Sequence, residues 1–253
     1  MDALSRFRLD ERAVVLTGAS SGLGLGFARA LAAAGADLAL LARRAERLEA
    51  LADEIRSTGQ RVLTHATDVA DPAQCGAAVA ATIEAFGRID VLVNNAGVGR
   101  AVPTSREKPE AFADTLQVNL SGPFHMAQAC APHMPPGSAI VNVASVLGHI
   151  APRFPQAAYA ASKAGLLGLT RNLAQEWSGR KGIRVNALCP GYFASEMTAD
   201  GDQQLRDMVA EHSMLGRFGE QAELDTALIF LASPASSYVT GTSLLVDGGM
   251  AAL

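Results

Sequence analysis

The sequence of 253 residues has few cysteines and little net charge. Its three cysteines (Cys75, Cys130 and Cys189) are an odd number without C-x-x-C spacing, which argues against a disulfide framework. The formal net charge of -4 lacks the strong basic excess of a nucleic-acid-binding protein. The five histidines do not occur at ligand spacing, so no metal site is expected.

Long uninterrupted apolar runs are also missing. Alanine and leucine predominate between Leu23 and Ala42, but Arg29 and Asp37 interrupt this segment, so it does not predict a membrane span. The N-terminal residues contain no apolar signal core. We therefore expect a cytoplasmic protein without membrane segments.

Short apolar runs alternate with helical patterns along the chain. The expected strands are residues 13–17, 37–42, 61–66, 89–93, 139–144, 184–188 and 243–246, and the expected helices are 25–34, 44–57, 72–86, 109–131, 157–178 and 221–232. This alternation predicts an α/β fold: a doubly wound parallel sheet of about seven strands with helices on both faces. Because no linker or repeat interrupts the pattern, we expect a single domain over residues 1–253.

A glycine loop follows the first expected strand. Gly18, Gly22 and Gly24 stand in G-x-x-x-G-x-G spacing, which differs from the G-x-G-x-x-G fingerprint. Between a strand and a helix, such glycines permit a tight turn, let backbone N–H groups approach a pyrophosphate, and let the helix pack closely. The loop predicts a dinucleotide site, with a purely structural turn as the alternative.

Tyr159 and Lys163 are four residues apart in an expected helix and so share one face. A cation about 4 Å from a phenol, at an effective dielectric near 20, stabilises the phenolate by roughly 4 kcal/mol, or about 3 pK units. Tyr159 could then exchange protons near neutral pH. The pair alone also fits an ordinary amphipathic helix. Ser145 at the end of an apolar run and Asn119 upstream favour a catalytic group.

Seven motifs resemble those of the short-chain dehydrogenase/reductases in order and spacing, over nearly the whole chain. They are Thr17-Gly18-x-x-x-Gly22-x-Gly24, Asp68-Val69, Asn94-Asn95-Ala96-Gly97, Asn119, Ser145, Tyr159-x-x-x-Lys163 and Pro190-Gly191. The resemblance implies a Rossmann-like domain, a nicotinamide dinucleotide cofactor, and hydride transfer between a carbonyl and a secondary alcohol.

By the same resemblance, the catalytic residues are Asn119, Ser145, Tyr159 and Lys163. Tyr159 would donate the proton, Ser145 would orient the carbonyl, Lys163 would lower the Tyr159 pKa and hold the ribose, and Asn119 would hold a water. The expected cofactor-binding residues are Gly18, Ser20, Ser21, Gly22, Leu23, Gly24, Arg43, Asp68, Val69, Asn95, Ala96, Gly97, Tyr159, Lys163, Pro190, Gly191, Phe193 and Ser195, the last replacing the family's usual threonine.

The end of the second expected strand favours NADP(H) over NAD(H). An NAD-selective enzyme places an acid there for the ribose 2′-hydroxyl, but this chain has Ala42, followed by Arg43 and Arg44. Arg43 is the expected phosphate ligand because its planar fork matches a phosphate, whereas Arg44 could equally be a solvated helix start. Ser21 stands where many NADP-dependent relatives carry a second cation.

A weakly patterned segment of residues 191–219 is expected to form a substrate lid. A mainly apolar pocket is predicted by Val146, Leu147, Ile150, Phe154, Phe193, Met197, Met208, Met214 and Leu215. We therefore expect a small, mainly apolar ketone or aldehyde as substrate. His149 and Arg153 could instead bind a polar group or be exposed loop residues.

Other readings remain open at this point. The chain could reduce 3-oxoacyl thioesters, although His133 and Gln175 stand where such relatives carry basic residues. It could be a dinucleotide-binding scaffold without activity, or a lyase or epimerase on the same fold. The family resemblance and the Ala- and Leu-rich helices around Asn119 and Tyr159 predict a homotetramer, with a dimer as the alternative; the residues concerned are Ala127, Ala129, Ala131, Leu166, Leu167, Leu169 and Leu173.

Overall fold

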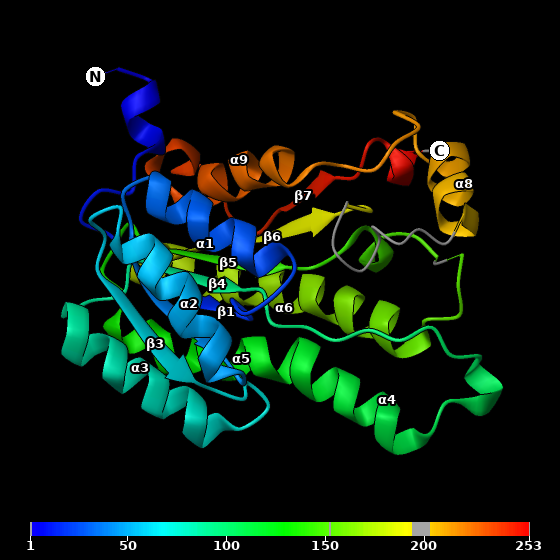
Figure 1. Cartoon of the computed structure of the whole chain (residues 1–253), viewed down its shortest axis with the longest axis horizontal. Helices are drawn as coiled ribbons and strands as arrows, with labels where there is room; N and C mark the ends of the chain where they lie inside the picture. Colours follow the sequence, from blue (N-terminus) through cyan, green and yellow to red (C-terminus); the bar gives the residue numbers. More distant parts are fainter. Residues whose placement is uncertain (1, 152, 194–202, 253) are drawn as a thin grey trace.

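The computed structural model describes residues 2–151, 153–193 and 203–252. Seven strands pair in parallel in the order β3-β2-β1-β4-β5-β6-β7 (Figure 1). Their bounds are β1 Ala13–Thr17, β2 Asp37–Ala42, β3 Val62–Ala66, β4 Val91–Asn94, β5 Ala139–Val143, β6 Arg184–Pro190 and β7 Ser243–Val246. The seven-stranded, doubly wound parallel sheet predicted from the apolar runs is confirmed.

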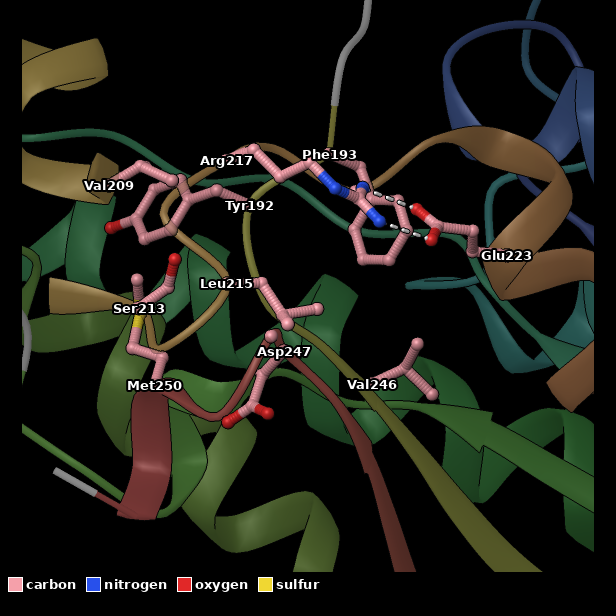
Figure 2. Close-up of a pocket in the computed structure, with 12 residues that line it drawn as sticks. Tyr192, Phe193, Val209, Ser213, Leu215, Arg217, Glu223, Val246, Asp247 and Met250 are labelled. Carbon is pink, nitrogen blue, oxygen red and sulfur yellow. Dashed lines mark hydrogen bonds and ion pairs between the residues drawn. The ribbon is translucent and has the colours of Figure 1, made fainter.

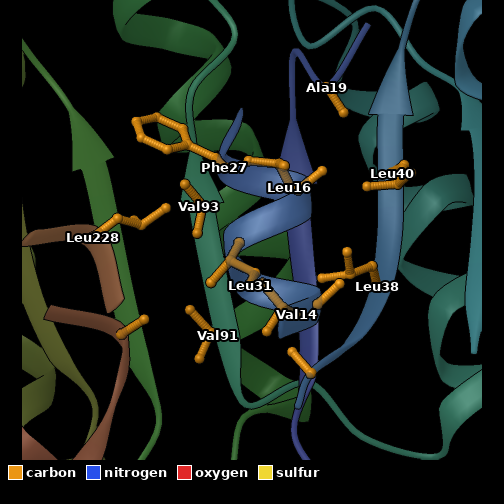
Figure 3. Close-up of a cluster of buried hydrophobic side chains, with 14 of the residues drawn as sticks. Val14, Leu16, Ala19, Phe27, Leu31, Leu38, Leu40, Val91, Val93 and Leu228 are labelled. Carbon is orange, nitrogen blue, oxygen red and sulfur yellow. The ribbon is translucent and has the colours of Figure 1, made fainter. Parts of the chain in front are cut away.

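Helices cover both faces of this sheet (Figure 1). One core packs α1 (Leu23–Ala33), α2 (Ala45–Arg56) and α9 (Gln221–Ala232) on one face, and a second core packs α3 (Pro72–Phe86), α5 (Gly122–Cys130) and α6 (Ala157–Lys181) on the other. Figure 3 shows Val14 and Leu16 of β1 in the first core, against Leu31 of α1. Val15 belongs to the second core, as alternation along a strand requires.

The predicted helix over residues 109–131 is interrupted. It consists of α4 (Pro109–Leu116), a π-helical turn (Gln117–Ser121) and α5. A π turn inserts one extra residue into the hydrogen-bonding pattern and is frequently found at functional sites. Asn119 lies in this turn and is fully buried.

Part of the predicted lid is a regular helix rather than an irregular segment. Helix α8 spans Gln203–His212, and its apolar side chains Met208 and Val209 pack against Val146 and Leu147. Leu205, Met208 and Val209 have helical spacing, a signal that the sequence interpretation missed. Residues 194–202 lie outside the described residues, so the lid as a whole stays a prediction.

Three further expectations concern membrane segments, cysteines and metal sites. In the described part of the chain, no helix is both long and apolar enough to cross a membrane. The three cysteines are buried and free. No cluster of three metal-ligating side chains is found among the described residues.

Candidate active site

A cavity of about 910 Å³ lies beside the loops that follow β1 to β6. Ligands in open α/β sheets bind at this carboxyl edge. All the predicted site residues line the cavity except Gly24 and Asn119, which lie behind it, and Ser195, which is outside the described residues. The volume is at the upper end for a ligand site, as a cavity for a dinucleotide together with a substrate requires.

The glycine loop fits a bound pyrophosphate. Gly18 (φ 68°) allows no side chain, because a Cβ would lie 2.7 Å from the Ala96 Cα. A Cβ on Gly24 would clash with the Gly18 carbonyl oxygen, so Gly24 lets α1 pack against the loop. At Gly22 (φ 56°), by contrast, an added Cβ would have no other atom within 4 Å, so this glycine faces open space. Gly22 directly precedes α1, so the helix N-terminus also faces this space.

Thr17 and Asn95 join the glycine loop to the loop after β4. The Thr17 hydroxyl accepts hydrogen bonds from the backbone N–H groups of Asn95 and Ala96, each at 3.0 Å. The Asn95 amide donates to the carbonyl oxygens of Thr17 (3.0 Å) and Gly18 (3.2 Å). Asn95 therefore shapes the cavity wall through its backbone contacts. Thr17 belongs to the site for the same reason, although only its neighbour Gly18 was predicted.

Arg44 has a role that the sequence left open. Its guanidinium donates to the Ser21 hydroxyl at 2.9 Å and to the Ser20 hydroxyl at 3.3 Å, across the cavity from α2 to the glycine loop. Arg43 and Arg44 both line the cavity beside the buried Ala42, which carries no charge. The cavity wall thus carries two arginines here, one of which is bonded to two hydroxyls of the glycine loop.

Asp68 and Val69 form the next part of the wall. The Asp68 carboxylate accepts a hydrogen bond from the Ala70 N–H at 3.0 Å. The backbone N–H of Asp68 donates to the side-chain oxygen of Gln74 at 2.9 Å. Pro190 and Gly191 close the opposite side. Phe193 follows them and forms an isolated bridge with Gly219 at the far end of the lid segment.

Ser145 and Tyr159 lie together in the cavity. Ser145 follows β5 in an extended conformation, and its hydroxyl accepts from the Leu147 N–H at 3.1 Å. Burial raises the pKa of Tyr159, and the hydrogen bond from the Ser145 hydroxyl opposes this rise. Nearby Tyr192 raises the pKa of Tyr159 further. The two hydroxyl groups therefore lie close together on the cavity wall.

Lys163 does not lower the Tyr159 pKa as predicted. Its ammonium is buried, donates to the Val143 carbonyl at 2.8 Å, and lies 5.5 Å from the centroid of the Tyr159 ring. Burial lowers the pKa of Lys163 to about 8. The pKa of Tyr159 is raised by burial, opposite to the lowering predicted from helical spacing.

Asn119 contacts the site indirectly. Its side-chain oxygen accepts from the Val98 N–H, and its amide donates to the Val98 carbonyl, each at 2.8 Å, and to the Ser162 hydroxyl at 3.0 Å. These bonds hold the loop after β4 against α6. The water-binding role expected from the resemblance remains a prediction.

The substrate end is less apolar than expected. Val146, Leu147 and Phe193 line the cavity, but Met214 and Leu215 are exposed, and Met197 lies outside the described residues. The other apolar residues expected there, Ile150, Phe154 and Met208, pack in one hydrophobic cluster with Val146 and Leu147 and do not line the cavity. His149 and Arg153 are exposed and do not line it either. Two residues that the sequence interpretation missed, Gln156 and Tyr192, do line it.

A second cavity of about 80 Å³ lies behind Tyr192 and Phe193 (Figure 2). The ion pair between Arg217 and Glu223, at 2.7 Å, borders it. A water molecule occupies about 30 Å³ in the liquid, so this space has room for only a few waters. It is therefore far smaller than the first cavity.

Comparison with known proteins agrees with this geometry. A family model described as enoyl-(acyl carrier protein) reductase matches residues 18–251. The chain is 42% identical to galactitol 2-dehydrogenase of Cereibacter sphaeroides over 98% of both chains. It is 38% identical to a 3-oxoacyl-[acyl-carrier-protein] reductase of Thermotoga maritima, over 96% of this chain and 99% of the relative. The solved structure of a gluconate 5-dehydrogenase from Burkholderia cenocepacia, in complex with NADP and tartrate, has a TM-score of 0.93 at 39% identity and full coverage of both chains.

We predict that Ser145→Ala raises the Tyr159 pKa further, because the variant loses the hydrogen bond that favours the phenolate. The measurement is an NMR titration of carbon-labelled tyrosine, which is practical because the chain has only three tyrosines. Ser138→Ala, at the opposite end of β5, is the control and should leave this pKa in place. A Tyr159 pKa that stays constant or falls in Ser145→Ala would contradict the assignment.

Proposed function

Because the chain belongs to the short-chain dehydrogenase/reductases, a family of oxidoreductases that use a nicotinamide dinucleotide, we propose that it interconverts a small ketone or aldehyde and a secondary alcohol with NADP(H). The observation that carries this proposal is the placement of Ser145, Tyr159 and Lys163 in the same cavity as the glycine loop. The sequence predicted a mainly apolar substrate. Only the wall formed by Val146 and Leu147 fits that expectation.

Side chains of the protein supply the general acid and the hydrogen bonds that polarise the carbonyl group. A nicotinamide dinucleotide held in the cavity would supply the hydride acceptor or donor. During reduction negative charge grows on the carbonyl oxygen, where the Ser145 and Tyr159 hydroxyls donate hydrogen bonds. Tyr159 then gives its proton to this oxygen; the raised pKa of Tyr159 keeps the proton available at neutral pH. Lys163, buried beside Tyr159, would hold the cofactor ribose.

We predict that Tyr159→Phe lowers kcat by about 10²- to 10⁴-fold, the usual contribution of a general acid, while cofactor affinity stays close to that of the wild type. Steady-state turnover of a ketone and fluorescence titration with NADPH measure the two effects. Tyr238→Phe, at a fully exposed tyrosine, is the matched control. Near-normal turnover by Tyr159→Phe would remove Tyr159 from the mechanism.

The proposed preference for NADP(H) is supported by the charges around the adenosine end. Arg43 and Arg44 supply two cations, and Ser20 and Ser21 supply hydroxyl donors. Ala42 offers no carboxylate to bind a ribose 2′-hydroxyl or to repel a phosphate. Arg44 thereby joins Arg43 as a proposed phosphate ligand.

We predict that Ala42→Asp with Arg43→Ala shifts the kcat/KM ratio toward NAD(H) by at least about tenfold, or about 1.4 kcal/mol. Arg44→Ala should raise the KM for NADPH more than the KM for NADH, since the guanidinium is lost from the same phosphate site. Arg47→Ala, on the next turn of α2 and outside the cavity, is the control. A wild type that already favours NADH at equal concentrations would contradict the preference.

Reduction of 3-oxoacyl thioesters is the second candidate, favoured by the relative from Thermotoga maritima. His133 and Gln175 are exposed where carrier-protein reductases, by the resemblance, have basic residues. A panel of free ketones, secondary alcohols and one acyl carrier thioester separates the candidates. Higher kcat/KM for the thioester than for every free carbonyl would favour the second candidate, and no turnover of any compound would favour an inactive scaffold.

We also propose a homotetramer, with a dimer as the alternative. The structure corrects most of the argument from these helices, because five of the seven residues are buried within the single chain: Ala127, Ala131, Leu166, Leu167 and Leu173. Phe124 on α5 and Leu245 on the edge strand β7 remain exposed and offer two separate apolar contacts. Light scattering should give a mass of four chains for the wild type and a smaller assembly for Phe124→Glu. A monomeric wild type at micromolar concentration would contradict the proposal.

A further inference from the structure

The turn of residues 67–71 after β3 forms one end of the large cavity, which Thr67, Asp68 and Val69 line. The Ala70 N–H donates to the Asp68 carboxylate at 3.0 Å, which fixes the shape of the turn. The Thr67 N–H donates to the Ala42 carbonyl oxygen of β2 at 3.0 Å, which ties the turn to the sheet. The distance between the turn and α5, on its other side, depends on different contacts.

His125 supplies a hydrogen bond from α5. Its ring Nδ1 lies 3.2 Å from the Val69 carbonyl oxygen, and the Cys75 thiol of α3 donates to the same oxygen at 3.5 Å. A carbonyl oxygen can only accept, so Nδ1 of His125 carries the proton. Because a thiol is a weak donor, His125 is the stronger of the two partners.

Gly122 packs on the same turn, three residues before His125 and therefore on the same side of α5. A Cβ at Gly122 would lie 2.7 Å from the Val69 Cγ2 atom and 3.2 Å from the Val69 carbonyl oxygen. The missing side chain lets Val69 approach the helix, and the His125 hydrogen bond holds it there. Together these two residues set the position of Val69.

The strand order shows which part of a cofactor this turn would contact. Strand β3 neighbours β2, so the turn lies beside Arg43 and Arg44, which follow β2. In the proposed complex these arginines bind the 2′-phosphate of the adenosine ribose. Adenine is attached to that same ribose, so the base would lie against the adjacent wall at Val69. His125 does not line the cavity and can act on the base only through Val69.

We infer that His125 is a positioning residue for the adenosine end of the cofactor: its hydrogen bond to the Val69 carbonyl oxygen holds Val69 where that residue forms the wall for the base. This rests on the proposed function and assigns a determinant of cofactor affinity to α5, outside the cavity. The nicotinamide end, at Ser145 and Tyr159, is formed by other elements, so a change at His125 should leave the chemical step unaffected.

The test measures binding by calorimetry, with NADPH and with adenosine 2′,5′-bisphosphate, which has the base and the 2′-phosphate without the nicotinamide. His125→Leu should raise the Kd of both ligands by at least about threefold, the effect of one lost hydrogen bond. His125→Asn keeps an N–H donor close to the position of Nδ1 and should restore most of the affinity. His133→Leu, at an exposed histidine beyond α5, is the control and should bind as the wild type does.

Two further measurements separate positioning from a general loss of structure. In His125→Leu the KM for NADPH should rise while kcat at saturating NADPH stays within about twofold of the wild type. Gly122→Ala favours the helix but moves Val69, so it should weaken binding of adenosine 2′,5′-bisphosphate without lowering the Tm. Nitrogen NMR of the neutral His125 ring should show the proton on Nδ1.

The outcomes separate this inference from the proposed function. Wild-type affinity in both His125→Leu and Gly122→Ala, equal losses in His125→Leu and His125→Asn, or a neutral ring protonated on Nε2 would each overturn the inference and leave the proposed function standing. If the wild type binds NADH instead of NADPH, the same comparison uses NADH and ADP. Absence of binding of both cofactors by the wild type would overturn the inference and the proposed function together.

Discussion

Hydrogen bonds between Thr17 and the loop after β4 connect the two halves of the site. They join the ends of β1 and β4, the neighbouring strands at which the sheet order changes direction. At such a point adjacent loops diverge toward opposite faces and leave a crevice. Asn95 donates two further hydrogen bonds to the end of β1, so the glycine loop and the loop after β4 are held as one unit.

The catalytic groups depend on a second set of buried polar contacts. The π turn brings Asn119 to the Val98 loop and to Ser162 of α6, one residue before Lys163. Lys163 reaches back to the Val143 carbonyl of β5, next to Ser145. Because buried amide and ammonium groups need partners, these bonds limit how α6 can lie on the sheet. The positions of Tyr159 and Ser145 follow from that constraint.

Polarity divides the large cavity into regions with different tasks. Cations and hydroxyls gather at Arg43, Arg44 and Ser21, beside a neutral Ala42. The middle of the cavity is lined by glycine residues and backbone atoms. There, close approach of a ligand to the backbone matters more than charge. At the far end Gln156 and Tyr192 face an apolar wall.

The sequence by itself determined the strands, the glycine loop and the Tyr159–Lys163 pair, because these depend on periodicity and on spacing within a few residues. Tertiary structure alone decided that Arg44 reaches Ser21, that Lys163 binds the Val143 carbonyl instead of shifting Tyr159, and that Leu166 is core rather than interface. It also brought Gln156 and Tyr192 into one cavity. These contacts join residues that are 20 or more positions apart in the sequence. A local sequence pattern does not indicate which distant group will accept a hydrogen bond from a buried donor, or which groups will be buried together away from water.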